Sequence, residues 1–109
     1  MDLRERLADV QRRPHAYGLT TFGEVAAFVT GVDAATEWQF LGGFRQFLAD
    51  KSHLGPNLAW QVMVIRMAYP AEADEFWVTA SHSESMEAIS VLFSELQSFL
   101  AHRDGPGTN

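Results

Sequence analysis

The stretch from Leu58 to Tyr69 most constrains what this chain can fold into. Its residues are apolar or aromatic with two exceptions, and a proline follows it directly. The β-branched run Val62–Ile65 could form a buried strand on its own. The whole stretch is longer than a typical strand, and a helix that is apolar on most sides belongs at the centre of an α domain. We therefore expect a central helix over about Asn57–Tyr69, with Asn57 at its N-cap.

Two capping boxes predict helix starts on either side of that stretch. Thr21 with Glu24, and Ser81 with Glu84, have the spacing in which a hydroxyl and a carboxylate satisfy the first free amides of a helix. Apolar residues at helical spacing follow both pairs. Proline and glycine set other boundaries, because Pro14 closes the first apolar segment and Gly18 lies in the turn after it.

The pattern predicts an all-α fold, a single compact domain of five or six helices around a central apolar helix. The domain covers residues 1–103, and residues 104–109 form a flexible tail. The expected helices cover about 3–13, 21–33, 35–51, 57–69 and 81–102, and residues 71–80 form either a short acidic helix or an irregular loop.

Composition excludes several classes of protein. The chain of 109 residues has no cysteine, which removes disulfides, thiolate chemistry and cysteine-bound zinc. No secretory leader of the usual form and no membrane-spanning apolar run is visible, so we expect a soluble cytoplasmic protein without membrane contact. An isoelectric point of about 5.0 also argues against direct binding of nucleic acid, which needs a basic footprint.

The net charge of −6 is confined to one part of the chain. Residues 67–102 contain six carboxylates and no Lys or Arg, while acids and bases balance elsewhere. Such a stretch is commonly a solvated acidic surface. The alternative is an acidic face that docks a basic protein. The acids are Glu72, Asp74, Glu75, Glu84, Glu87 and Glu95.

The last expected helix places part of this charge on one outward ridge. Its inward half holds Met86, Ala88, Ile89, Leu92, Phe93, Leu96, Phe99 and Leu100. On the other half, Glu87, Val91 and Glu95 follow at intervals of four, so an apolar side chain lies between two carboxylates. We expect Glu87 and Glu95 to face solvent. Val91 is either a partner-binding residue or an ordinary exposed valine.

The expected helix over Ala35–Lys51 leaves Trp38 away from its buried stripe of Phe40, Leu41, Phe44, Phe47 and Leu48. Trp38 is therefore a further candidate for partner binding. Gly42 and Gly43 also lie off the stripe, in what would be mid-helix. They either let a neighbouring segment pack closely or leave room for a partner, and packing is the more common use of glycine.

Catalytic and metal-binding patterns are absent from the sequence. The best metal candidate, His82 with Glu84 and Glu87, is equally explained by helix capping and the helix dipole. No Gly-x-Ser-x-Gly elbow or phosphate-binding glycine loop occurs. We expect neither an enzyme nor a cofactor-binding or metal-binding protein.

The chain resembles small immunity proteins of bacterial polymorphic-toxin systems in its size, acidity and helical texture. The local sequence that supports the resemblance is Arg4-Glu5-Arg6-Leu7 and the turn Arg13-Pro14-His15-Ala16-Tyr17-Gly18-Leu19. The resemblance implies a protein-binding inhibitor that occludes a cognate toxin domain. Complementary charge independently favours a basic partner. Two other classes stay open: a helical oligomerisation or scaffold module that forms a homo-oligomer, and a small-molecule-binding domain using Tyr17, Trp60 and Tyr69.

Overall fold

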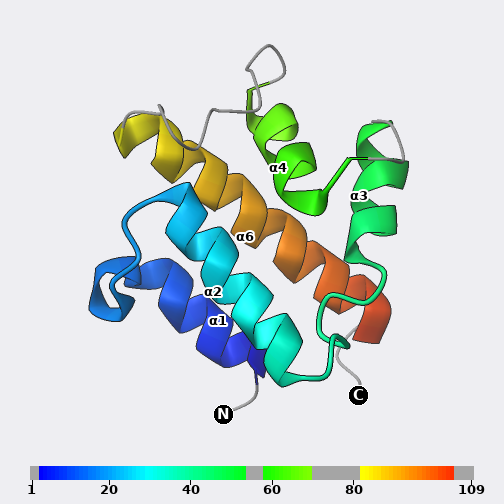
Figure 1. Ribbon diagram of the computed structural model, residues 1–109, viewed down its shortest axis with the longest axis horizontal. Coiled ribbons are helices and arrows are strands. Elements are labelled where there is room, and N and C mark those ends of the chain that lie inside the picture. Colours follow the sequence, from blue (N-terminus) through cyan, green and yellow to red (C-terminus); the bar gives the residue numbers. More distant parts are fainter. Residues whose placement is uncertain (1–2, 54–57, 70–81, 105–109) are drawn as a thin grey trace.

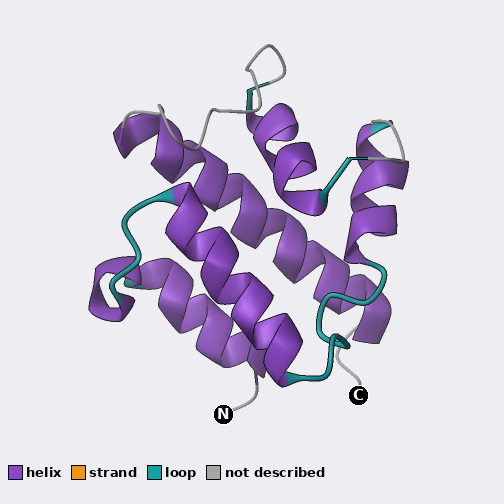
Figure 2. Ribbon diagram, viewed as in Figure 1, coloured by secondary structure: helices purple, strands orange, loops and turns teal. Residues whose placement is uncertain are grey.

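Helices account for every regular element in the computed structural model over residues 3–53, 58–69 and 82–104, the part of the chain it describes (Figure 1). They are α1 (Leu3–Arg12), the 3-10 helix η1 (Pro14–Tyr17), α2 (Phe22–Ala35), α3 (Phe44–Ser52), α4 (Trp60–Ala68) and α6 (His82–Asp104). Figure 2 shows these helices together with the described loops and turns between them. The predicted all-α single domain is confirmed. Of the predicted tail at 104–109, Asp104 is instead the last residue of α6, and 105–109 lie outside the described residues, as does the stretch at 71–80.

The other helices pack around α6. It contacts each of the other α-helices that the structure describes, with α1 and α2 along one side and α3 and α4 along the other (Figure 1). The inward face predicted for this helix is confirmed: seven of its eight residues are buried, and Met86 lies half-buried at the edge. They are Ala88, Ile89, Leu92, Phe93, Leu96, Phe99 and Leu100.

The predicted position of the Asn57–Tyr69 segment at the centre was wrong. Within α4 only Met63, Val64 and Ile65 are buried, and the rest of the helix is half-buried against α3 and α6. Helix length explains why α6, and not α4, lies at the centre. The 23 residues of α6 span about 35 Å, whereas the nine of α4 span about 14 Å and cannot reach every other helix.

Local capping fixes the start of α2 as predicted. The amide of Glu24 donates to Thr21 Oγ1 at 3.1 Å, and the amide of Thr21 donates to Glu24 Oε1 at 3.0 Å. The buried Ser85 adds a tertiary contact, because its Oγ accepts from the amide of Phe22 at 2.5 Å. α6 begins at His82, next to the predicted start, and Ser81 lies outside the described residues.

Two other helix boundaries differ from the predicted ones. α2 continues through Gly31 to Ala35, because the cost of one exposed glycine, about 1 kcal/mol, is small beside the packing of its helix. α4 begins at Trp60 with Ala59 at its N-cap, so Asn57, outside the described residues, is not the N-cap.

Candidate functional site

Trp38 is the most exposed large apolar side chain in the described part of the chain. Its relative exposure is 65%, against 44% for Tyr17, the other large apolar residue exposed there. Trp38 lies in the turn over residues 36–43 between α2 and α3. The predicted helix over Ala35–Lys51 is wrong in its first part, since α3 begins only at Phe44. An exposed tryptophan on a turn is a candidate contact for a partner, because Trp is enriched at binding hot spots.

Two polar side chains build this turn in place of helix. Asp33 Oδ1 accepts from the amide of Leu41 at 2.9 Å, and Thr36 Oγ1 accepts from the amide of Phe40 at 3.0 Å. Side chains of Asp and Thr compete with helical hydrogen bonds in this way. Phe40 and Leu41 are thereby drawn into the core, with 4% and 9% exposure, while Trp38 stays outside.

The backbone at Glu37 and Trp38 is held in the left-handed region. Their φ angles are +59° and +65°, which side chains of L-residues rarely adopt. Hydrogen bonds hold them there: the amide of Trp38 donates to Asp33 O at 2.7 Å, and that of Glu37 to Ala34 O at 3.1 Å. Both side chains are exposed. Strain retained by surrounding contacts is typical of functional segments, which makes this pair the core of the candidate site.

Gly42 and Gly43 lie in the turn before α3, so their predicted position in the middle of a helix was wrong. Gly43 has φ +92°, and a Cβ built on it would lie 3.7 Å from the Phe99 ring. At Gly42 a Cβ would lie 3.4 Å from the carbonyl oxygen of Gln39. Gly43 therefore serves the turn conformation that leads into α3.

A shallow groove lies next to the turn, between α3 and the C-terminal part of α6. Phe47 and Phe99 form its apolar lining, with ring centroids 5.5 Å apart, and Asp50 and His102 also line it. Arg103 Nη1 donates to the carbonyl of Phe40 at 2.7 Å, which ties the turn to α6. We call Glu37, Trp38 and this groove the Trp38 surface.

The acidic ridge predicted on α6 does not present its members equally. Glu87 is exposed, but Glu84 is half-buried and Val91 packs against the core. Glu95 was expected to face solvent, and that was wrong: its side chain is 12% exposed and its Oε1 accepts from Lys51 Nζ at 2.8 Å. The ion pair arises because α3 ends beside α6, a placement that α6's own periodicity does not encode.

Three other predicted contact residues, Glu72, Asp74 and Glu75, lie outside the described residues. Within the described ranges, no group of three or more His, Asp or Glu side chains is placed to hold a metal ion. No helix in the same ranges is long and apolar enough to cross a membrane. Of the rings considered for a small-molecule site, Tyr17 lines a pocket on α1 and α2, whereas Trp60 packs on Phe44 with centroids 5.7 Å apart.

No family model, curated protein or solved structure matches this chain. The turn around Trp38 was not apparent from helical periodicity. Its sequence signals are Asp33 followed by Thr36 near the end of an apolar segment, since both side chains cap backbone amides readily, and the Gly42-Gly43 pair, which marks turns.

Proposed function

We propose that this protein is a protein-binding inhibitor of the immunity type, which occludes a basic toxin domain through the Trp38 surface. The observation that carries the proposal is the 65% exposure of Trp38 on a turn held by backbone and side-chain hydrogen bonds. A rigid aromatic side chain loses little conformational entropy on binding, so it contributes strongly to affinity.

The carboxylate next to Trp38 favours a basic group of a partner at that position, while the groove beside it is lined by Asp50 together with Lys51 and Arg103. Glu37 and Trp38 are adjacent and both exposed, so a Lys or Arg side chain of a partner can lie over the indole and beside the carboxylate. Among cation–π interactions, those with a Trp ring are the strongest. The net charge of −6 adds a long-range attraction that speeds encounter.

The acids on α6 take a lesser part in this proposal. Glu87 is exposed and supports steering at a distance from the turn, whereas Glu95 already has Lys51 as its counter-ion. Rim charges of this kind change the association rate more than the lifetime of a complex. The anchor of the complex is therefore Trp38 and not the ridge.

The first test compares variants in capturing a partner from the native host. Trp38→Ala should lose the protein that the parent retains, and its Kd for the purified partner should rise about 30-fold or more. Tyr17→Ala, which removes another exposed aromatic ring, is the matched control and should bind as the parent does. Glu37→Gln should slow association at low salt more than Glu87→Gln does.

A growth assay tests the inhibitory role itself. Expression of the captured partner should arrest growth, co-expression of the parent protein should restore it, and co-expression of Trp38→Ala should not. A partner that leaves growth unchanged would overturn the immunity role. Equal binding by Trp38→Ala and the parent would overturn the Trp38 surface as the site. If no partner is captured and the parent dimerises while Trp38→Ala stays monomeric, the oligomerisation module is favoured.

A further inference from the structure

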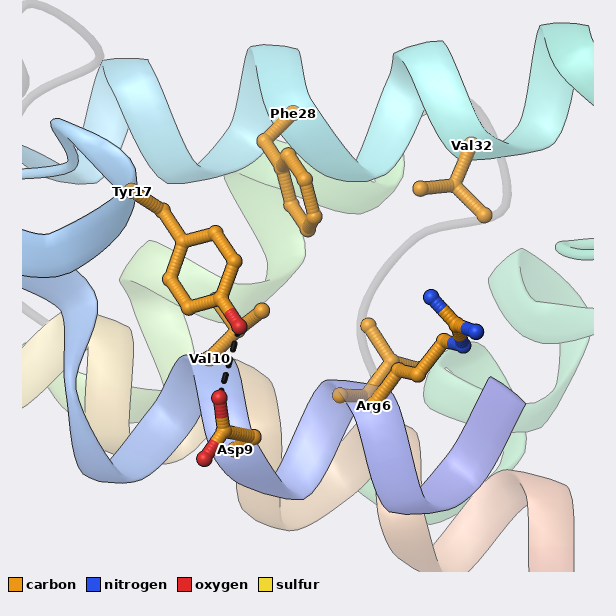
Figure 3. A pocket seen from close by; sticks show the side chains of 7 residues that line it. Arg6, Asp9, Val10, Tyr17, Phe28 and Val32 are labelled. Atoms are coloured by element: carbon orange, nitrogen blue, oxygen red, sulfur yellow. Dashed lines mark hydrogen bonds between the residues drawn. The ribbon is translucent and has the colours of Figure 1, made fainter. Parts of the chain in front are cut away.

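A second, separate feature is a pocket between α1, η1 and α2 (Figure 3), whose volume is about 240 Å³. Apolar side chains dominate its lining, and Leu7 and Val10 are both buried. The lining residues are Arg6, Leu7, Asp9, Val10, Tyr17, Phe28 and Val32. This pocket lies across α2 from α3 and α4, and it shares no lining residue with the Trp38 surface.

Both carboxylate oxygens of Asp9 accept hydrogen bonds from neighbouring side chains. Its Oδ2 accepts from the Tyr17 hydroxyl at 2.6 Å and from Arg13 Nη2 at 2.6 Å, and its Oδ1 accepts from Arg12 Nη2 at 2.7 Å. The hydrogen bonds from Arg13 and Tyr17 lower the pKa of Asp9 to about 2. The carboxylate is thus charged at neutral pH, and two arginines neutralise it.

Arg6 is the remaining charged group of the pocket. It forms no hydrogen bond or ion pair with another described residue, although Asp9 lies one helical turn away. Figure 3 shows its guanidinium group extending from α1 toward α2, at the opposite end of the pocket from Tyr17. A guanidinium group offers paired donors that match a carboxylate.

The charge around the pocket also favours an anion. Residues 3–13 hold four arginines against the two carboxylates Glu5 and Asp9, in a chain that is acidic overall. A negative ligand at Arg6 therefore enters a segment of net positive charge, and a positive ligand is repelled.

The size of the pocket limits the rest of the ligand. A buried cavity of roughly 150 Å³ holds a benzene molecule. The 240 Å³ here accommodates one ring with a short acidic side chain. Phe28 and Val32 project from α2 over that space, and the hydrogen bond to Asp9 fixes the Tyr17 ring at its far end (Figure 3).

We propose that this pocket binds a small aromatic monocarboxylate, with the ring between Tyr17, Phe28 and Val10 and the carboxylate on Arg6. This ligand site is separate from the Trp38 surface, so either proposal can be overturned without affecting the other.

Titration of the full chain with phenylacetate tests the site. Amide resonances of residues 6–10, 17 and 28–32 should shift in NMR spectra, and calorimetry gives the affinity. Arg6→Gln should weaken binding about tenfold, the loss expected for one charged hydrogen-bonding group, and Arg6→Lys should restore part of it. Arg4→Gln removes the same charge outside the pocket lining and should weaken binding far less than Arg6→Gln does.

Two further measurements keep the proposal open to refutation. Phenethylamine, which carries a cation on the same ring, should bind far more weakly than phenylacetate. Val32→Phe places a ring inside the pocket and should abolish binding of phenylacetate. The proposal is overturned if Arg6→Gln binds as the parent does, if phenethylamine binds equally well, or if the shifted resonances lie elsewhere.

Discussion

The carboxylate of Asp33, near the end of α2, accepts a hydrogen bond from the amide of Leu41 at 2.9 Å, and this bond closes the turn that exposes Trp38. The carbonyl of Asp33 also accepts from the amide of Trp38 at 2.7 Å. One residue therefore holds both the buried and the exposed part of the turn, and the shape of the candidate site depends on it.

Replacing Asp33 with alanine should lower the free energy of unfolding by about 1–2 kcal/mol, because the amide of Leu41 loses its partner in a half-buried setting. Urea denaturation measures the change. Asp33→Asn keeps an oxygen acceptor and should lose less. Equal losses in the two variants would show that the hydrogen bond is not the source of the stability.

Replacing Glu37 with glycine should stabilise the fold by about 0.5–1 kcal/mol, since glycine adopts a positive φ without strain. The same substitution at the exposed Ala27, inside α2, should cost about 1 kcal/mol. Thermal unfolding of both variants gives the comparison. A loss of stability in Glu37→Gly would mean that the left-handed conformation carries no strain.

Replacing Ile65 with alanine should lower the free energy of unfolding by about 2–5 kcal/mol, because its side chain is 2% exposed and a cavity would remain. Val62 on the same helix is half-buried, so Val62→Ala should cost clearly less. Chemical denaturation of the two variants tests whether the face of α4 that carries Ile65 is the buried one.

The carboxyl group of Asp9 should stabilise the fold at neutral pH, and this contribution should disappear at acid pH. Its pKa is lowered from 3.8 to about 2, first by the hydrogen bond from Arg13 and then by that from Tyr17. Because the pKa is lower in the folded than in the unfolded state, the ionised carboxyl stabilises the fold at pH values above the unfolded-state pKa. This stability is lost as the pH falls from about 4 to 2. Carbon NMR titration of the Asp9 carboxyl measures the pKa directly, and Tyr17→Phe should raise it.

Stability measured across that pH range should separate Asp9 from other acids. Asp9→Asn removes the stability that the ionised carboxylate of Asp9 contributes, so the variant should lose less stability than the parent between pH 4 and 2. Asp50→Asn, at an exposed residue that accepts only from Gln46 among the described side chains, is the control. A parent and an Asp9→Asn variant with the same acid dependence would contradict the assignment.

Signals confined to one segment predicted the structure well. The Thr21–Glu24 capping box needs only four residues, and its hydrogen bonds form as expected. Pro14 closes α1, and Gly18 follows with φ +72°. The buried face of α6 followed from periodicity because one helix has one geometry.

Predictions that needed a second element failed. Glu95 lies on the polar half of α6 by periodicity, yet Lys51, 44 positions away in sequence, covers it. The turn at residues 36–43 replaced helix because Asp33 and Thr36 accept from backbone amides of the turn, and because Arg103 of α6 donates to the carbonyl of Phe40. The pocket beside Arg6 also depends on how α1 and α2 lie together.

By itself the sequence determined the helical class, the start of α2, the inward face of the last helix and the acidic imbalance of residues 67–102. These follow from residue types and local hydrogen bonds. Only the tertiary structure decided that α6 is the centre, that Glu95 has a counter-ion, that residues 36–43 form a turn and that Arg6 borders a pocket. Exposure and pairing depend on which helix lies next to which, and helix neighbours are set by the packing of the whole core.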